Sequence, residues 1–293
     1  MAKNPAPEPR VTAAAGWPGL EVPEALGGAG ATFAETVVVL EELGRAAAST
    51  PFLGTVLGVG ALLAVAPSPA RDDLLARAAA GDTSLAVAFD PPAEFVVDAP
   101  DADVVLLVVD DHLVVADVAV EAQPVLDESR SLGIVTFGGG GTAARHAWPL
   151  ADPAAIVRRG ALAVTADSLG VAEAMLAATV AYVKERHQFG RPIGSFQAVQ
   201  HACADMLVAV TVSRELLATA VGGGDPRHVA MAKSHVTSAA VDVVGKALQL
   251  HGGIGYTWES GIHRYLKRAL LNRDLFGSPR AHRATLITER SLS

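Results

Sequence analysis

The strongest constraint on the fold of this chain is the helical hydrophobic period of residues 152–293, which short glycine-containing breaks interrupt. Long apolar helices joined by short loops pack as antiparallel bundles, because each helix buries one face against its neighbours. Glycine at a helix end supplies the left-handed C-cap. We therefore expect a C-terminal four-helix bundle here. Its helices are expected at Pro153 to about Glu185, Ser195 to about Ala220, Asp225 to His251, and from near Trp258 onward.

Residues 1–83 form a second helical region, after a flexible Pro- and Ala-rich lead. Thr32 followed by Glu35 makes a capping box that starts a helix. Ser68 precedes a proline and therefore suits the N-cap of another helix, which Gly81 ends. Three helices are expected, at about Thr32–Ala48, Leu53–Val65 and Ser68–Gly81.

Residues 84–151 show short β-branched runs separated by Asp, Gly and Pro clusters, which is typical of a small antiparallel β unit. The expected fold class is α+β, mainly α. It comprises an N-terminal helical domain (1–83), a small antiparallel β domain (84–151) and the C-terminal four-helix bundle (152–293). The predicted strands are Leu85–Phe89, Val104–Val109, Leu113–Val118 and Ile134–Phe137.

The composition excludes several classes of protein. Of 293 residues, 31 are acidic and 23 basic, so the formal charge is −8 and a nucleic-acid partner is not expected. Cys203 is the only cysteine, which excludes a disulfide framework and a cysteine zinc site. The apolar stretch Leu53–Ala66 is shorter than the ~18 residues that a spanning helix needs. The start of the chain does not resemble a signal peptide. We therefore expect a cytoplasmic protein without membrane insertion.

Some possible sites have a simpler structural interpretation. Gly138–Gly141 follows a predicted strand, but neither the helix nor the acidic residue of a dinucleotide-binding motif follows it, so we expect a plain loop. His201 and Asp205 share a helix face without further metal ligands, and we expect no metal site. No Gly-x-Ser-x-Gly elbow supports a hydrolase. Glu41–Glu42 and Asp72–Asp73 are expected on solvated helix faces.

Packing alone does not explain two segments of the expected bundle, residues 185–201 and 248–256. The first places an arginine and an amide side chain on a rigid inter-helix loop beside exposed aromatic residues. The second places glycine backbone at a helix end. Arginine pairs with pyrophosphate, amides bond polar edges and aromatic rings flank planar ligands. Together the two segments suit a planar ligand that carries phosphate.

These segments resemble the signatures of the acyl-CoA dehydrogenase family. The stretch Arg186-x-x-Phe189-Gly190-x-x-Ile193-x-x-Phe196-Gln197 is similar to a flavin-contacting loop of that family, and Gln249-x-x-Gly252-Gly253-x-Gly255-Tyr256 is similar to a second one. The resemblance continues through residues 17–30 and 41–44, so it covers nearly the whole chain. In particular, the chain resembles the paired subunits of actinobacterial steroid side-chain pathways.

The resemblance implies an FAD-dependent enzyme that dehydrogenates an acyl-CoA thioester at its α and β carbons. It also implies a hetero- or homo-oligomer, in which FAD lies between the β domain and the bundle and a neighbouring subunit completes each site. In the family, the arginine and glutamine commonly reach the adenosine-pyrophosphate half of a flavin held mainly by another subunit. The positions that carry over as cofactor contacts are Arg186, Phe189, Gln197, Gln249, Gly252 and Gly253.

The catalytic base of the family is missing from its two usual positions. The reaction needs a carboxylate that takes the α-proton opposite the flavin. One family position aligns with Gly277 and the other with Ser238. Asp242 and Asp274 lie near these positions, but offsets of three or four residues direct them elsewhere. We therefore predict no catalytic residue. The glutamates beyond Gly190 stand at neither position; they are Glu215, Glu259 and Glu289.

The β domain also departs from the family. Phe89–Glu94 replaces a Thr-Glu-Pro-type flavin loop, and no tryptophan occurs between Trp17 and Trp148. Three hypotheses follow. The leading one is a subunit that lends Arg186 and Gln197 to a flavin whose base and ring pocket belong to a partner chain. The second is a self-sufficient FAD-dependent dehydrogenase with an atypical base. The third is a scaffold or acyl-CoA-binding subunit that holds no flavin.

Overall fold

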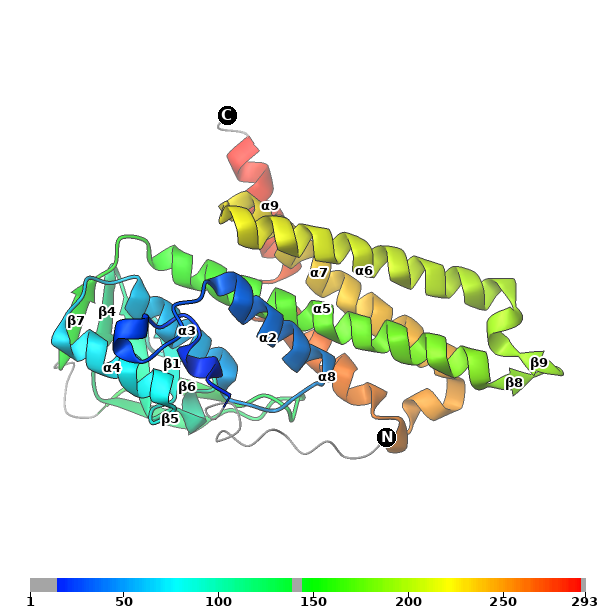
Figure 1. Ribbon diagram of the computed structural model, residues 1–293, viewed down its shortest axis with the longest axis horizontal. Coiled ribbons are helices and arrows are strands. Elements are labelled where there is room, and N and C mark those ends of the chain that lie inside the picture. Colours follow the sequence, from blue (N-terminus) through cyan, green and yellow to red (C-terminus); the bar gives the residue numbers. More distant parts are fainter. Residues whose placement is uncertain (1–14, 139–143, 291–293) are drawn as a thin grey trace. The chain divides into compact units, whose positions relative to one another are not determined.

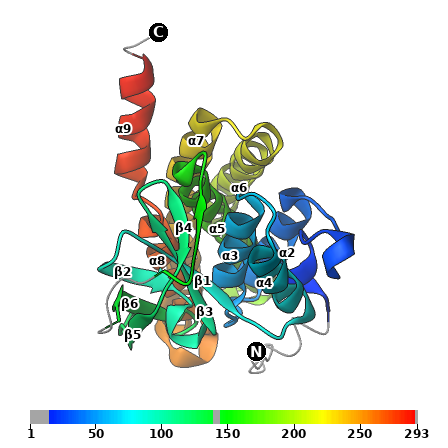
Figure 2. The same ribbon diagram turned by 90° about the vertical axis from the view of Figure 1, so that its left-hand side faces the viewer.

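The computed structural model describes residues 15–138 and 144–290, with side chains placed as far as Ile287. Its elements follow the expected order of helices, strands and helices, so the α+β, mainly α fold class is confirmed (Figures 1 and 2). Contacts divide the chain into two compact units. Within the described residues, the bundle unit comprises 40–48 and 161–290, and the sheet unit comprises 15–39 and 49–160.

The helices of the N-terminal region begin and end with the predicted caps. Ser68 Oγ accepts a hydrogen bond from a first-turn amide at 3.3 Å, and Gly81 ends that helix at a φ of 77°. The backbone N–H of Thr32 donates to Glu35 at 2.8 Å, which confirms the capping box. These helices are α2 (Phe33–Arg45), α3 (Phe52–Leu63) and α4 (Pro69–Ala80), and short 3₁₀ turns at Trp17–Gly19 and Glu24–Leu26 precede them.

The β region consists of two small sheets, ordered β1-β3-β4-β7 and β2-β6-β5. Alternating small and branched residues fill the core between their faces, among them Ala86, Leu107 and Val135. The strands are β1 (Leu85–Phe89), β2 (Ala93–Val97), β3 (Val104–Val109), β4 (His112–Val115), β5 (Val118–Ala122), β6 (Leu132–Phe137) and β7 (His146–Pro149).

The expectation of a purely antiparallel β unit is wrong in one place, because β1 and β3 pair in parallel, from Leu85 with Val104 to Phe89 with Val108. The connection between these two strands contains β2, which joins the other sheet. After this crossover, β3 can run in the same direction as β1. The predicted strand Leu113–Val118 divides into β4 and β5 for a related reason. Each half pairs in a different sheet.

The expected long helices of the bundle are present. The second starts at Gln197, because residues 193–195 form a 3₁₀ turn. The fourth starts at Ile262, and an additional helix follows Gly277. The elements are α5 (Pro153–Glu185), a short hairpin of β8 (His187–Gln188) and β9 (Arg191–Pro192), α6 (Gln197–Gly223), α7 (Pro226–His251), α8 (Ile262–Asp274) and α9 (Pro279–Arg290).

Two glycines allow α2 and α5 to cross at backbone contact in the bundle unit. A Cβ built on Gly44 would lie 2.0 Å from the carbonyl oxygen of Asp167, and one on Gly170 would lie 1.9 Å from that of Glu41. Real side chains do not approach backbone this closely. The crossing therefore requires glycine on both helices, and it brings Glu41 onto the surface of α5.

Two described helices are long and apolar enough to cross a membrane by length and composition, which corrects the expectation that Leu53–Ala66 is the longest such stretch. The most apolar window of α5 is 72% buried, as in a core helix, whereas that of α6 is 28% buried. An apolar helix in the core of a bundle needs no membrane. The outer face of α6 is therefore the unusual feature.

Candidate functional site

The first predicted flavin-contacting segment forms the β8–β9 hairpin between α5 and α6 (Figure 1). Phe189 and Gly190 make its turn at positive φ, 53° and 78°. The backbone N–H of Arg186 donates to the carbonyl of Tyr182 at 2.9 Å, and the carbonyl of Arg186 accepts from Ile193 at 2.8 Å. The base of the hairpin therefore fixes the backbone of Arg186.

The second segment begins where α7 ends. Gly252 has a φ of 61° and a ψ of −143°, a conformation that residues with a Cβ avoid. A Cβ built on Gly252 or Gly253 would meet no atom of this chain within 4 Å. The backbone at this turn is therefore open to close approach by a group from outside the chain.

One pair of side chains brings the two segments together. The Tyr182 hydroxyl donates to the carbonyl of His251 at 3.3 Å. The two rings also stack, with centroids 4.3 Å apart and planes inclined by 20°. Since Tyr182 lies one turn before Arg186 and His251 directly precedes Gly252, the two predicted loops are neighbours.

The six predicted cofactor contacts are all exposed. Phe189 is the extreme case, with 90% of its surface exposed. The Arg191 guanidinium lies 4.0 Å from the centroid of the Phe196 ring and so covers that neighbouring ring. The exposed positions are Arg186, Phe189, Gln197, Gln249, Gly252 and Gly253. This chain alone therefore presents these residues on an open surface.

Gly277, the first position at which a base was predicted to be absent, has its own local structure. Gly277 has a φ of 96°, and a Cβ built there would lie 2.9 Å from His282 Nε2. That nitrogen donates to the carbonyl of Phe276 at 2.9 Å. Burial lowers the pKa of His282, and the charge of Lys233 adds to this effect. His282 therefore fills the turn at Gly277, the position predicted to align with the family's base.

The other predicted alternatives for a base are dispersed. At the second family position, Ser238 donates to the carbonyl of Ser234 at 2.9 Å. The remaining acidic residues considered in the sequence analysis, where their side chains are described, are all exposed: Asp242, Asp274, Glu215 and Glu259. The side chain of Glu289 lies outside the described residues.

His201 and Asp205 are exposed on α6, and the described residues contain no cluster of three or more metal-ligand side chains. Gly138 is described, whereas residues 139–141 are not.

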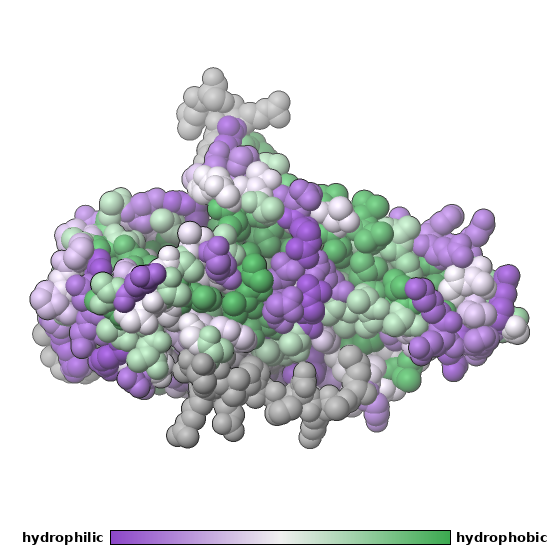
Figure 3. Space-filling view, in the orientation of Figure 1, coloured by the Kyte–Doolittle hydropathy of each residue, from purple (hydrophilic) through white to green (hydrophobic). Residues whose placement is uncertain are grey.

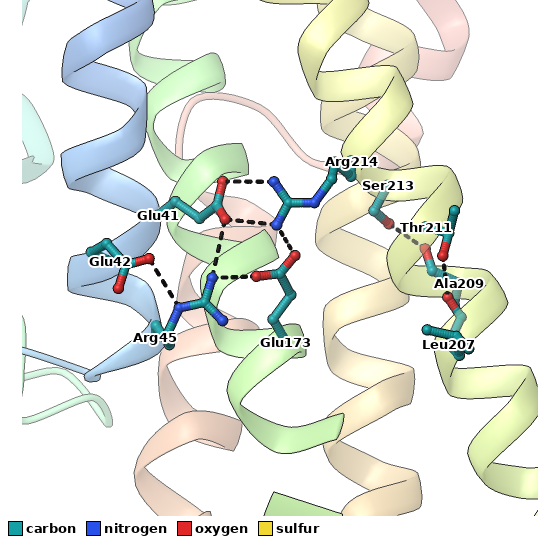
Figure 4. A network of polar contacts seen from close by, with 9 residues as sticks. All are labelled: Glu41, Glu42, Arg45, Glu173, Leu207, Ala209, Thr211, Ser213 and Arg214. Carbon is teal, nitrogen blue, oxygen red and sulfur yellow. Dashed lines mark hydrogen bonds and ion pairs between the residues drawn. The ribbon is translucent and has the colours of Figure 1, made fainter. Parts of the chain in front are cut away.

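A network of charges that the sequence did not indicate joins three helices (Figure 4). Glu41 on α2 accepts from Arg45 at 3.2 Å and from Arg214 of α6 at 2.8 Å. Glu173 of α5 pairs with both arginines. Hydrogen bonds that Arg214 donates to the Glu41 carboxylate raise the pKa of Arg214. The prediction of a solvated face is wrong for Glu41, because the crossing of α2 and α5 leaves its side chain half-buried. The prediction is correct for Glu42, whose side chain is exposed.

A second polar cluster is fully buried in the bundle unit. Arg268 makes a bidentate pair with Asp167, at 2.9 and 2.6 Å, and the Asn272 amide donates to the same carboxylate at 2.6 Å. Arg268 also donates to the carbonyl of Ala48 at 2.7 Å. These contacts tie α5 and α8 to the end of the 40–48 segment. Because the carboxylate and guanidinium satisfy each other, we interpret the cluster as structural.

Lys233 is a third buried polar group. Its ammonium donates to the carbonyls of Asn272 and Arg273, at 3.1 and 2.9 Å, and so caps the end of α8. Burial lowers its pKa to about 7. The position of a lysine among the apolar residues of α7 is the sequence feature from which this buried contact could have been predicted.

Comparisons with known proteins agree with this architecture. The model of the acyl-CoA dehydrogenase N-terminal domain matches residues 5–82, and that of the C-terminal domain matches residues 154–291. The chain is 38% identical to acyl-CoA dehydrogenase IpdE2 of Mycolicibacterium smegmatis over 262 residues, which are 89% of this chain and 80% of that protein.

Two solved structures are also similar. The ChsE4-ChsE5 complex from Mycobacterium tuberculosis matches with a TM-score of 0.87 and 28% identity, covering 97% of this chain and 88% of the other. A variant of the Tcur3481-Tcur3483 steroid ACAD matches with a TM-score of 0.86 and 28% identity, covering 97% and 89%.

Proposed function

Because this chain belongs to the acyl-CoA dehydrogenase family, we propose that it is one subunit of an oligomeric, FAD-dependent acyl-CoA dehydrogenase. It lends its two exposed loops to a flavin held mainly by a partner chain. The observation that carries this proposal is that the six predicted flavin contacts are exposed in or beside two segments that a Tyr182–His251 contact joins. The catalysed reaction is the α,β-dehydrogenation of an acyl-CoA thioester.

The residues present fit FAD, the cofactor of this family. The exposed guanidinium of Arg186 can pair with a pyrophosphate, and the Gln197 and Gln249 amides can bond polar edges. Gly252 and Gly253 leave the space beside their backbone open. All of these groups are exposed in this chain, which supports a flavin whose other contacts come from a second chain.

The proposal divides the chemistry between two chains. Bound FAD supplies the hydride acceptor, and a base must remove the α-proton. In this chain Gly277 and Ser238 offer no carboxylate at the two family positions. The base is therefore assigned to the partner chain, and Arg186 and Gln197 bind and orient the cofactor.

Exposed apolar surface supports a protein partner. Beside the charge network, the groove between α5 and α6 has a volume of about 750 Å³ and is lined by Leu176, Val180 and Leu207. Figure 3 shows hydrophobic residues gathered over α5 and α6 between two hydrophilic areas. Val208 of α6 is 63% exposed. Large exposed apolar patches are typical of interaction surfaces.

Three hydroxyl groups on α6 do not oppose its burial. The hydroxyls of Thr211, Ser213 and Thr219 donate to carbonyls one turn earlier, at 2.7 to 2.9 Å (Figure 4 shows the first two). Since these donors are already satisfied, covering the helix with another subunit leaves them hydrogen-bonded. The similar ChsE4-ChsE5 structure is a complex of two chains, which supports a second acyl-CoA dehydrogenase-type chain as partner. Location in the cytoplasm stays a prediction.

The test is co-purification of this chain with an acyl-CoA dehydrogenase-type partner, followed by flavin spectra before and after an acyl-CoA is added. We expect yellow colour only in the complex and bleaching by the thioester. Arg186→Ala should lower the flavin content of the complex, whereas the exposed Arg283→Ala on α9 should leave it unchanged.

Other outcomes of this test select the alternatives. A yellow protein that bleaches when purified alone would establish the self-sufficient enzyme. A colourless complex would favour the scaffold. An Arg186→Ala complex with full flavin content would refute the shared site.

A further inference from the structure

The contact between Tyr182 and His251 spans 69 positions of sequence and joins the two flavin-contacting loops. We propose that these two side chains are positioning residues, which set the spacing between the two halves of the flavin-contacting surface. The inference rests on the proposed function, because it assigns how this chain holds its part of that site in shape.

Each of the two residues is tied to its own loop. The carbonyl of Tyr182 accepts from Arg186 at 2.9 Å, so a shift of Tyr182 shifts the base of the hairpin. His251 directly precedes Gly252. A Cβ built on Gly255 would lie 3.1 Å from the Cβ of His251, which shows that the glycine turn closes over this residue.

The orientation of the His251 ring is also fixed. Its Nδ1 lies 2.8 Å from the carbonyl of Ala247, and because a carbonyl can only accept, Nδ1 carries the proton. The ring of Tyr182 stacks on this pinned ring, and its hydroxyl reaches the carbonyl of the same residue. A hydrogen bond and a ring stack between the same two residues therefore hold the end of α5 against the end of α7, next to the two segments in the chain.

The chain provides a matched control for a purely structural role. Tyr265 on α8 donates to the carbonyl of Arg45 at 3.1 Å, so it makes the same kind of bond from a half-buried tyrosine to a backbone carbonyl in the same unit. Tyr265 contacts neither flavin loop through this bond. If Tyr182 served only general stability, Tyr182→Phe and Tyr265→Phe should have equal effects.

Hydrogen–deuterium exchange of the full chain tests the positioning role without flavin. We expect Tyr182→Phe to speed exchange of residues 249–257 about fivefold, as for one lost hydrogen bond. Tyr182→Leu, which also removes the ring stack, should speed it about 10- to 50-fold. Tyr265→Phe should leave this segment unchanged. The inference would be overturned if residues 249–257 exchanged at the unaltered rate in all three variants, or if their exchange rose equally in all three.

FAD titrated into the complex separates this inference from the proposed function. Tyr182→Leu should raise the dissociation constant for FAD at least about tenfold, with Tyr182→Phe intermediate and Tyr265→Phe equal to the unaltered complex. If Arg186→Ala weakens FAD binding while Tyr182→Leu does not, the positioning role fails and the proposed function stands. If Arg186→Ala has no effect, the shared flavin site itself fails.

Discussion

The buried cluster around Asp167 and the two exposed segments of the proposed flavin site lie in the same bundle unit, yet their polar residues have opposite roles. Arg268 and Asn272 are fully buried, and both bond the Asp167 carboxylate. Arg186, beside the β8–β9 hairpin, and Gln249, in the last turn of α7, are exposed. Polar residues inside the bundle therefore hold helices together, whereas these two side chains are free of such packing and belong to the proposed flavin site.

The largest expected effect comes from breaking the buried cluster. Asp167→Ala leaves the Arg268 charge buried without its carboxylate, so the free energy of unfolding should fall by about 3–5 kcal/mol. Urea unfolding followed by circular dichroism measures this change. The exposed Asp242→Ala should shift the free energy by less than about 0.5 kcal/mol. Comparable losses in both variants would contradict the division between the regions.

The helix crossing should give the next largest effect. Gly170→Ala places a Cβ against the carbonyl of Glu41 and should lower the free energy of unfolding by about 2–3 kcal/mol, as overpacking does. Gly245 is the matched control, because its helix position on α7 has open space beside it. Gly245→Ala should raise stability by about 0.5–1 kcal/mol in thermal or urea unfolding. Equal signs for the two variants would refute the close approach.

Lys233 should make stability depend on pH. Its pKa is about 7 in the folded chain and 10.5 in the unfolded chain, so the unfolded state binds more protons between these values. The free energy of unfolding should therefore rise between pH 7 and 10.5, by at most about 1.4 kcal/mol per pH unit. Lys233→Met should abolish this rise relative to the unaltered protein. An unchanged slope in urea titrations at pH 7.5 and 9 would exclude Lys233 as its source.

A smaller effect is expected when a glutamate is placed at the usual position of the base. Gly277→Glu forces a side chain into positive φ beside His282, which should cost about 1–2 kcal/mol of stability. It should not give this chain a base of its own, so flavin bleaching by an acyl-CoA should be no faster than in the unaltered complex. Faster bleaching would show that the turn can adopt the family geometry.

The smallest stability effect is expected at the exposed residues of the proposed flavin site. Gln249→Ala should change the free energy of unfolding by less than about 0.5 kcal/mol, because its side chain is exposed. The same variant should lower the flavin content of the complex. A large loss of stability would place Gln249 with the structural residues and remove the contrast with Asp167.

Much of the fold followed from local patterns in the sequence. Thr32, Ser68 and Gly81 marked helix boundaries that the structure contains, because caps act within one turn. The parallel pairing of β1 and β3 did not follow, because it depends on β2 joining a different sheet. The sequence also failed to predict the burial of Glu41, because that burial depends on the close crossing of α2 and α5 at Gly44 and Gly170, which are distant in the sequence.

The sequence by itself determined the helical periods, the caps, the two motifs predicted to contact flavin and the absence of a glutamate at position 277. These are properties of short stretches or of residue identity. Only the tertiary structure decided that Tyr182 meets His251, that Asp167 meets Arg268, and that His282 fills the turn at Gly277. Such pairings depend on which helix faces are turned toward each other. Periodicity indicates that a face is buried, but it does not say which residue of another helix lies against it.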